Sequence, residues 1–274
     1  MIKFVLYLIG LSNSRVAMAY TWERKDLMVK VMLSLPGVAT QILVSVGKKE
    51  ERIDFLLDCG SGTLRDLLLN HYLSEEGFKR IKAVLISHEH FDHVGDLYPL
   101  MDFMHMIGRR EPLEVFVPKP SIVVTDFVST LRKFRKSSLT YNIRLLEVCD
   151  GDEFLYGPIK VRAFQVVHRG STKTEPVGPY IPAVGYSIMY NDMRIVYSGD
   201  TGLCESLVRE VDGADLAILE ATWKERKERY REVHLSEEEA IELGRTAKDF
   251  LLVHRLSDLY HALGQKRSHN TSSG

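Results

Sequence analysis

The sequence predicts an α/β fold in which two β-sheets pack on each other and helices cover their outer faces. Runs rich in β-branched and aromatic residues recur along the chain, and segments with apolar residues at helical spacing alternate with them. No stretch rich in Pro, Gly and Ser divides these elements, so we expect a single domain. A hydrophobic content of 45% and a charged content of 27% are ordinary for a globular protein, and they exclude a disordered chain or a collagen-like rod.

The strands are predicted from apolar, β-branched segments that end at turn residues. The first two are separated by Pro36-Gly37, and the third runs into Asp58-Cys59-Gly60-Ser61-Gly62, whose two glycines suit a tight turn into a helix. Asn191-Asp192 predicts a hairpin turn later in the chain. The expected strands cover residues 27–35, 40–46, 52–57, 82–87, 113–117, 143–148, 159–167, 183–190, 194–197, 216–219 and 250–253.

The helices are predicted from apolar residues spaced three and four positions apart. Ser236 and Glu239 form a capping box that marks one helix start. The segment 223–231 alternates Lys and Arg with Glu, and Glu225 lies four residues before Arg229, so we expect a solvated helix there. The expected helices cover residues 63–72, 94–107, 121–134, 203–211, 223–231 and 236–248.

The domain is expected to span residues 27–263, after an N-terminal extension of residues 1–26 and before a polar tail of residues 264–274. No apolar run approaches the ~20 residues that a transmembrane helix needs, so we expect no membrane partner. The three cysteines are too few and too scattered for a disulfide framework. Their odd number favours a reducing compartment, and we expect a cytoplasmic protein.

The extension begins with a short apolar run and contains Ala17-Met18-Ala19, a combination that resembles a secretory signal. Arg15 lies inside the cleavage region of such a signal, however, and the apolar run covers only residues 4–11. We therefore favour an added N-terminal strand, or a true start at Met18 or Met28.

The charge balance gives the chain no overall attraction for nucleic acid. The 36 basic and 37 acidic residues leave a formal net charge of −1. A local basic patch remains compatible with this balance. The cluster at residues 132–136 lies at the end of an expected helix, where cations are favoured by the helix dipole, and we interpret it as a solvated surface.

One short segment carries the strongest chemical signal. Residues 87–93 read Ser-His-Glu-His-Phe-Asp-His directly after an apolar strand, and packing does not explain three imidazoles so close together. If the segment is extended, His88, His90 and Asp92 project to one side and His93 to another, so the loop could offer ligands to two metal ions. Imidazole and carboxylate ligands without thiolate favour zinc, with manganese or iron as alternatives.

The segment Ser-His-Glu-His-Phe-Asp-His-Val-Gly resembles the signature of the metallo-β-lactamase superfamily. Four other places resemble the rest of that pattern: the Asp-Cys-Gly that begins at Asp58, His168 after a long strand, the Ser-Gly-Asp-Thr that contains Asp200, and His254 at the end of the last strand. The resemblance runs from about residue 27 to residue 254. It implies a four-layer αββα sandwich and a dinuclear metal site.

The resemblance also implies a role for each matching residue. One metal would be bound by His88, His90 and His168, the second by Asp92, His93 and His254, and Asp200 would bridge the two. The implied cofactors are two Zn²⁺ ions, with Mn²⁺ or Fe²⁺ as alternatives. Two cations about 3.5–4 Å apart can share a hydroxide that acts as the nucleophile, because they lower the pKa of the parent water from ~15.7 towards neutrality.

Within the superfamily, two segments resemble the ribonuclease Z-like phosphodiesterases. They are Leu219-Glu220-Ala221-Thr222 and His234-Leu235-Ser236. In that branch Asp92 and Glu220 would flank His234, which would donate a proton to the leaving oxygen while Glu220 fixes its tautomer. The alternative for His234 is a residue at the entry of a helix that hydrogen-bonds to nearby backbone.

The chain departs from the tRNA-processing members in one respect. Bacterial members carry a long tRNA-gripping arm between the ligands that match His168 and Asp200, whereas only 32 positions separate these residues here. A Pro-rich loop, residues 170–182, and a hairpin fill that space, and Tyr180 in the loop could stack on a base. RNA remains a candidate substrate, but a smaller phosphodiester, such as a cyclic or short oligonucleotide, fits at least as well.

The leading hypothesis is thus a two-zinc phosphodiesterase of the ribonuclease Z type, expected to be a homodimer by resemblance. The alternative is a hydrolase of carboxylic esters, thioesters or lactones on the same dinuclear site. A non-catalytic metal-binding scaffold is a third hypothesis, but all seven expected metal ligands are present, which argues against it.

Overall fold

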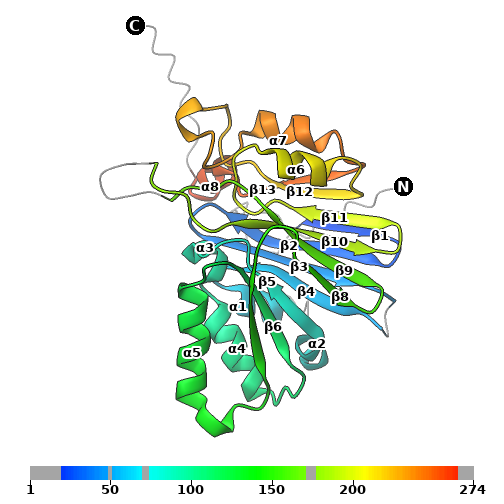
Figure 1. Ribbon diagram of the computed structural model, residues 1–274, viewed down its shortest axis with the longest axis vertical. Helices are drawn as coiled ribbons and strands as arrows, with labels where there is room; N and C mark the ends of the chain where they lie inside the picture. The colour runs from blue at the N-terminus through cyan, green and yellow to red at the C-terminus, as the bar shows by residue number, and fades with distance from the viewer. Residues whose placement is uncertain (1–19, 49–50, 70–73, 171–176, 265–274) are drawn as a thin grey trace, which may run out of the picture.

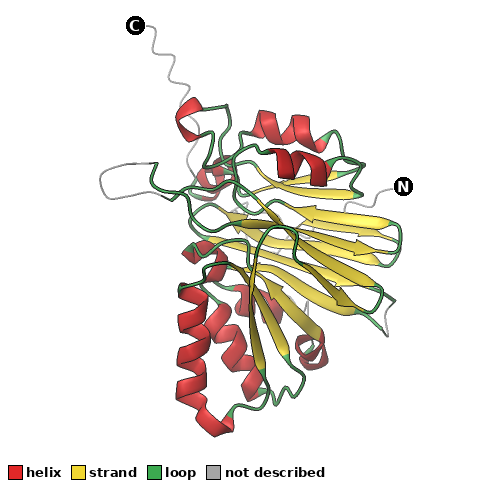
Figure 2. Cartoon of the chain, in the orientation of Figure 1, coloured by secondary structure: helices red, strands yellow, loops and turns green. Residues whose placement is uncertain are grey.

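Two β-sheets lie face to face, and helices cover the outer side of each sheet (Figures 1 and 2). This arrangement is seen in the computed structural model, which describes residues 20–48, 51–69, 74–170 and 177–264. The layers follow the order helix, sheet, sheet, helix. The predicted αββα sandwich is therefore confirmed.

The first sheet has seven strands that lie in the order of the sequence. Neighbours are antiparallel from β1 to β4 and parallel from β4 to β7. Helices α1 (Thr63–Leu69), α2 (Glu75–Arg80), α4 (Leu97–Met106) and α5 (Val123–Arg135) pack on its outer face through one apolar cluster. The strands are β1 (Tyr20–Arg24), β2 (Leu27–Leu35), β3 (Ala39–Val46), β4 (Ile53–Cys59), β5 (Ile81–Leu85), β6 (Leu113–Pro118) and β7 (Ile143–Val148).

The second sheet has six strands in the order β13-β12-β11-β10-β9-β8. The pairs β11·β12 and β12·β13 are parallel, and the others are antiparallel. Helices α6 (Glu205–Val211) and α7 (Glu237–Gly244) cover its outer face, and α8 (Leu256–Ala262) follows the last strand. The strands are β8 (Glu153–Tyr156), β9 (Ile159–Gln165), β10 (Val184–Tyr190), β11 (Met193–Tyr197), β12 (Leu216–Glu220) and β13 (Phe250–Val253).

The main core lies between the two sheets, and each sheet shares a second core with its helices. Strand β3 shows why, because all eight of its residues are buried. Ile42 and Val44 belong to the core between the sheets, whereas Leu43 between them belongs to the core under the helices. Successive side chains of a strand point to opposite faces, so β3 contributes apolar side chains to both cores.

The parallel strands bring their carboxyl ends to one edge of the sandwich. In the first sheet β4 and β5 are parallel neighbours, and in the second sheet β11, β12 and β13 are. Figure 1 shows α3 (Phe91–Val94) and α8, which follow β5 and β13, at the same edge of the molecule. The loops after parallel strands are the usual place for a ligand site in such folds.

The first strand begins earlier than the expected domain boundary. Strand β1, at residues 20–24, pairs with β2, and the indole nitrogen of Trp22 donates a hydrogen bond to Asp249 over 2.9 Å. The sheet therefore includes residues that we assigned to the N-terminal extension. The signal-like segment of residues 1–19 lies outside the described residues. Helices α2 and α8 and strand β8 were also not predicted.

The predicted helix at residues 223–231 is wrong. The segment is a loop with one short 3₁₀ turn, η2 (Glu228–Tyr230). Its backbone folds back, because the N–H of Trp223 donates to Leu235 O over 3.2 Å and the N–H of Glu237 donates to Trp223 O over 2.6 Å. Because the segment consists mostly of charged residues, a helix here would have no apolar face to pack on the sheet.

Two other helix predictions can be compared in detail. The capping box of Ser236 and Glu239 is confirmed, and it opens α7. The helix expected at residues 94–107 is confirmed as α4, which begins three residues later, whereas the short α3 before it was not predicted. Among the described residues, none of these helices is long and apolar enough to cross a membrane.

Gly60 holds the end of β4 against the loop that follows β5. A Cβ atom at this position would lie 2.1 Å from the carbonyl oxygen of Asp92 and 2.6 Å from the backbone nitrogen of Thr40. Both neighbours are backbone atoms, which cannot turn aside as a flexible side chain can. The contact therefore requires glycine and fixes the distance between β4 and α3, at the end of the His-rich loop of residues 86–90.

Replacing Gly60 with alanine should therefore lower the free energy of unfolding by about 1–3 kcal/mol, the cost typical of an overpacked core. Urea denaturation of the purified protein measures this change. Gly170→Ala is the control, because its Cβ would meet nothing closer than 3.4 Å. Equal stabilities of the two variants would show that the close approach at Gly60 does not constrain the fold.

Candidate metal centre

The His-rich loop starts at the end of β5 and turns into helix α3 after five residues, 86–90. His90 has an extended backbone and is the N-cap of α3, so Asp92 and His93 lie within that helix. We expected the segment to stay extended and Asp92 to share a side with His88 and His90. That expectation is wrong, because the alternation of a strand ends where the helix begins.

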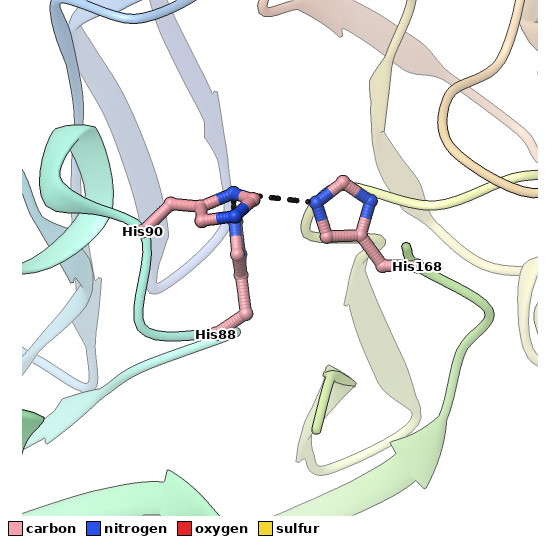
Figure 3. Close-up of side chains that lie close together, drawn as sticks. All are labelled: His88, His90 and His168. Atoms are coloured by element: carbon pink, nitrogen blue, oxygen red, sulfur yellow. Dashed lines mark hydrogen bonds between the residues drawn. The ribbon is translucent and has the colours of Figure 1, made fainter. Parts of the chain in front are cut away.

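Three imidazoles meet in a first cluster (Figure 3). His90 lies between His88 and His168, with its Nδ1 3.0 Å from Nε2 of His88 and 3.4 Å from Nε2 of His168. His88 and His90 come from the loop after β5, whereas His168 follows β9 of the second sheet. Ring nitrogens of residues that follow strands of both sheets therefore meet at one point between the sheets.

A second cluster lies beside the first and is formed by Asp92, His93 and His254. An oxygen of Asp92 lies 3.3 Å from Nε2 of His254 and 3.7 Å from Nε2 of His93. The same oxygen accepts a hydrogen bond of 2.7 Å from the N–H of Gly37, in the turn between β2 and β3. That hydrogen bond fixes the orientation of the carboxylate toward the two rings.

Asp200 lies between the two clusters. Its carboxylate oxygens are 3.8 Å from His88, 3.5 Å from His93 and 3.5 Å from His254. The residue follows β11 in a Ser-Gly-Asp-Thr turn and is almost fully buried. One carboxylate is thus within reach of both groups of imidazoles, which is the geometry that a bridging ligand requires.

The donor set fits divalent metal ions. Four groups of three side chains each place their ligand atoms within 4.8 Å of one another, and Asp200 belongs to two of these groups. Nε2 of His93 is buried and has no hydrogen-bond partner among the described residues. A buried ring nitrogen without a partner is costly unless it has another ligand, and an imidazole and carboxylate set suits zinc and its neighbours.

The ring nitrogens that face away from the centre are held by the protein. Nδ1 of His168 lies 2.7 Å from Val233 O, Nδ1 of His254 lies 2.9 Å from the hydroxyl of Thr222, and Nδ1 of His88 lies 3.1 Å from the hydroxyl of Ser87. Such outer contacts fix the tautomer and the direction of a metal-binding ring.

Burial keeps two of the imidazoles neutral. It lowers the pKa of His88 well below its ordinary value, and the neighbouring ring of His93 adds to this effect. Burial likewise lowers the pKa of His168 to about 3. A neutral imidazole offers a free lone pair, which is the form that binds a metal.

The two carboxylates of the centre are ionised. Burial alone would raise the pKa of Asp92, but the hydrogen bond from His254 and the charge of His93 bring it to about 2. Burial opposes ionisation of Asp200 as well, and His254 and His93 hold its pKa well below the usual range. The centre therefore presents negative charge in a buried, imidazole-lined site, as expected for a place that binds cations.

Asp58 is a residue that the motif contained but to which we assigned no role. Its carboxylate accepts hydrogen bonds from the N–H and the hydroxyl of Ser87, 2.7 and 2.8 Å away, and lies 2.7 Å from Nδ1 of His93. The hydroxyl of Tyr197 donates to it over 2.5 Å. Burial would lower the pKa of His93, but Asp200 and Asp58 raise it well above its ordinary value.

Asp58 and His254 share an unusual backbone conformation. Both have positive φ angles, 58° and 56°, in the left-handed region that residues other than glycine rarely adopt. Each side chain is nonetheless fully engaged at the centre. Strain of this kind, on the order of 1–3 kcal/mol, is typical of sites where the side-chain direction matters more than the backbone.

Glu220 and His234 form a pair at the edge of the centre. Nδ1 of His234 lies 2.8 Å from a Glu220 oxygen and 3.9 Å from Asp200. The N–H of Thr201 and both the N–H and hydroxyl of Thr222 donate to Glu220. Burial would lower the pKa of His234, but the adjacent Glu220 and Asp200 raise it above its ordinary value.

The structure thus brings together every side chain that the sequence singled out for the site. The nine are His88, His90, Asp92, His93, His168, Asp200, Glu220, His234 and His254. The residues that support them, Asp58, Ser87, Tyr197 and Thr222, were not assigned. Asp58 could have been found from its place two residues before Gly60, at the end of the third expected strand. Thr222 lay in the quoted segment Leu219-Glu220-Ala221-Thr222, whereas no sequence signal marked Tyr197.

The fold and this centre define a metal-dependent hydrolase. Residues 54–254 match the family described as the beta-lactamase superfamily domain. Ribonuclease Z of Ignicoccus hospitalis is 31% identical over 79% of this chain and 84% of its own, and that of Archaeoglobus fulgidus is 28% identical over 73% and 76%. The chain belongs to the metallo-β-lactamase superfamily, in its ribonuclease Z-like branch.

Solved structures share the fold at lower identity. The metallo-β-lactamase fold protein YhfI from Bacillus subtilis superposes with a TM-score of 0.64 at 20% identity, covering 88% of this chain and 93% of its own. The short form of human tRNase Z gives 0.62 at 21% identity, covering 83% and 92%. Both matches extend over nearly the whole sandwich.

Asp58→Asn should weaken zinc binding by about 10–100-fold, because the amide no longer holds the His93 ring by a charged hydrogen bond. Competition between the protein and a chromophoric zinc chelator measures the affinity. Asp54→Asn is the matched control, since Asp54 is a fully buried carboxylate on the same strand that bonds to Ser45, away from the centre. Equal affinities of Asp58→Asn and the wild type would contradict the orienting role.

Proposed function

We propose that the chain is a phosphodiesterase that acts on RNA with two bound zinc ions. The pair of Glu220 and His234 carries this proposal, because the pair sits directly beside Asp200 at the cluster of imidazoles and carboxylates. The relatives named ribonuclease Z support RNA as the substrate class. A homodimeric assembly rests on the same resemblance.

The two clusters would hold one ion each. His88, His90 and His168 would bind the first, Asp92, His93 and His254 the second, and Asp200 both. When bound, a pair of zinc ions supplies a water molecule of lowered pKa and positive charge that stabilises the transition state of phosphoryl transfer. The buried Asp58, Ser87 and Thr222 keep the ligand side chains oriented for this task.

His234 would act as the proton donor to the leaving oxygen. Its Nδ1 donates to Glu220, so in the protonated ring, which the raised pKa of His234 favours, the proton on Nε2 is the one available to substrate. Glu220 is itself fixed by three hydrogen bonds from Thr201 and Thr222, so the ring cannot turn away without breaking this network. Protonation of an alkoxide as it leaves typically contributes 10²–10⁴-fold in rate.

The length of the segment between His168 and Asp200 bears on how large an RNA substrate the enzyme would bind. Only 32 positions separate the two residues, and the described part of this segment is a loop and the β10–β11 hairpin. We propose that the enzyme reaches phosphodiesters without a long gripping arm. A short or cyclic phosphodiester would fit the same centre.

His234→Ala should reduce turnover of bis-p-nitrophenyl phosphate and of an RNA substrate by about 10²–10⁴-fold in kcat, the usual contribution of a general acid. The larger loss is expected on RNA, since its alkoxide leaving group needs a proton more than p-nitrophenolate does. His105→Ala is the matched control, because His105 bonds to Thr140 between α4 and β7, outside the centre. Steady-state kinetics of the zinc-loaded proteins measure both.

The same assay should include a lactone and a thioester. Hydrolysis of these substrates that is indifferent to His234→Ala, with no turnover of phosphodiesters, would overturn the proposal in favour of a carboxylic ester, thioester or lactone hydrolase. A chelator should abolish all turnover, and added zinc should restore it.

A further inference from the structure

The loop of residues 223–231, between β12 and the segment of His234, lies beside the metal centre. We call it the basic loop, since five of its nine residues are Lys or Arg. The ring of Trp223, at its start, lies 6.3 Å from the ring of His234. Val233, two residues after its end, accepts the hydrogen bond from His168. Figure 1 shows this stretch, between β12 and α7, projecting near α8 at the edge that carries the centre.

Most cations of the basic loop have no carboxylate partner. Glu228 pairs with Arg226 over 2.9 Å, and the flanking Glu232 is engaged by Arg169 and by the hydroxyl of Tyr180, each over 2.8 Å. Glu228 and Glu232 are therefore occupied, whereas Glu225 is exposed and forms no ion pair with any described residue. Four exposed cations form no ion pair with any residue that the structure describes: Lys224, Lys227, Arg229 and Arg231.

The basic loop is held in place against the centre. A Cβ atom at Gly202 would lie 2.0 Å from Arg231 O, so the loop backbone packs directly on the segment that follows Asp200. The N–H of His234 donates to Tyr230 O over 3.2 Å. The backbone that carries these cations is therefore anchored beside His234.

Aromatic rings shape the outer part of the loop. The rings of Trp223 and Tyr230 lie 5.2 Å apart, and the ammonium group of Lys227 lies 4.1 Å above the Trp223 ring. Such a contact holds a cation in position without neutralising its charge. The loop therefore combines oriented positive charge with aromatic surface, the combination by which proteins bind RNA strands.

We propose that the basic loop binds backbone phosphates of the RNA substrate next to the scissile bond. The segment between His168 and Asp200 is too short to contact the RNA through a long arm. The basic loop would supply such a contact close to the centre. Phosphate contacts position a nucleic acid without reading its sequence, and they make affinity fall with salt. This inference rests on the proposed function, because it takes RNA as the substrate.

The test compares two double variants, each of which removes two positive charges. Lys227→Ala/Arg229→Ala removes two cations of the basic loop. Lys133→Ala/Lys136→Ala removes two exposed lysines at the C-terminal end of α5 that form no ion pair with any residue in the described part of the chain. For the zinc-loaded proteins, kcat/KM is measured on an unprocessed tRNA transcript and on bis-p-nitrophenyl phosphate. Binding of a short fluorescent single-stranded RNA is followed by anisotropy over a range of KCl concentrations.

The loop variant should lower the ratio of the two kcat/KM values roughly tenfold and make the slope of log K against log [KCl] shallower by about 1.4, or about 0.7 for each lost phosphate contact. The α5 variant should do neither. Lys227→Arg/Arg229→Lys keeps both charges and should retain the wild-type ratio, which separates lost charge from a misfolded loop.

An unchanged ratio and salt slope in the loop variant would overturn the inference, and so would equal losses in the loop and α5 variants. Failure of the proposed function would give a different experimental result from failure of this inference. In that case the wild type itself would hydrolyse neither the transcript nor bis-p-nitrophenyl phosphate.

Discussion

The buried carboxylate of Asp58 is the point on which the centre depends. It accepts hydrogen bonds from Ser87 at the base of the His-rich loop and orients His93 in α3, and both residues follow β5 of the first sheet. It also accepts a hydrogen bond from the hydroxyl of Tyr197, at the end of β11 in the second sheet. One residue therefore joins the two sheets where their ligands meet. The left-handed backbone of Asp58 is tolerated because a complete set of partners offsets its strain.

The sandwich follows from the same constraint. The proposed ligands His88 and His168 follow strands of different sheets, so their rings converge only if both sheets hold a fixed separation. The apolar core between the sheets sets that separation, and the close contact at Gly60 sets the position of the loop. A rigid scaffold is what allows a loop of only a few residues to carry so much of the chemistry.

Much of the fold and the centre could be predicted from the sequence, because both depend on local signals. Apolar runs marked most strands, and the spacing from His88 to His93 marked the centre. The conformation of the His-rich loop could not be predicted, since the helix that begins after His90 depends on packing at Gly60 and Gly95. The segment 223–231 was misassigned because backbone contacts of Trp223 with distant residues, not local charge pairs, decide its shape. The supporting role of Tyr197 arises only when the two sheets come together, and that of Thr222 only when β12 pairs with β13.

The central claim is that these side chains hold two metal ions side by side, and anomalous diffraction from crystals grown with zinc tests it most directly. The account predicts two peaks about 3.5–4 Å apart. One should lie among His88, His90 and His168, and the other between Asp92 and His254, with Asp200 touching both. A single peak, or zinc bound elsewhere on the molecule, would contradict it.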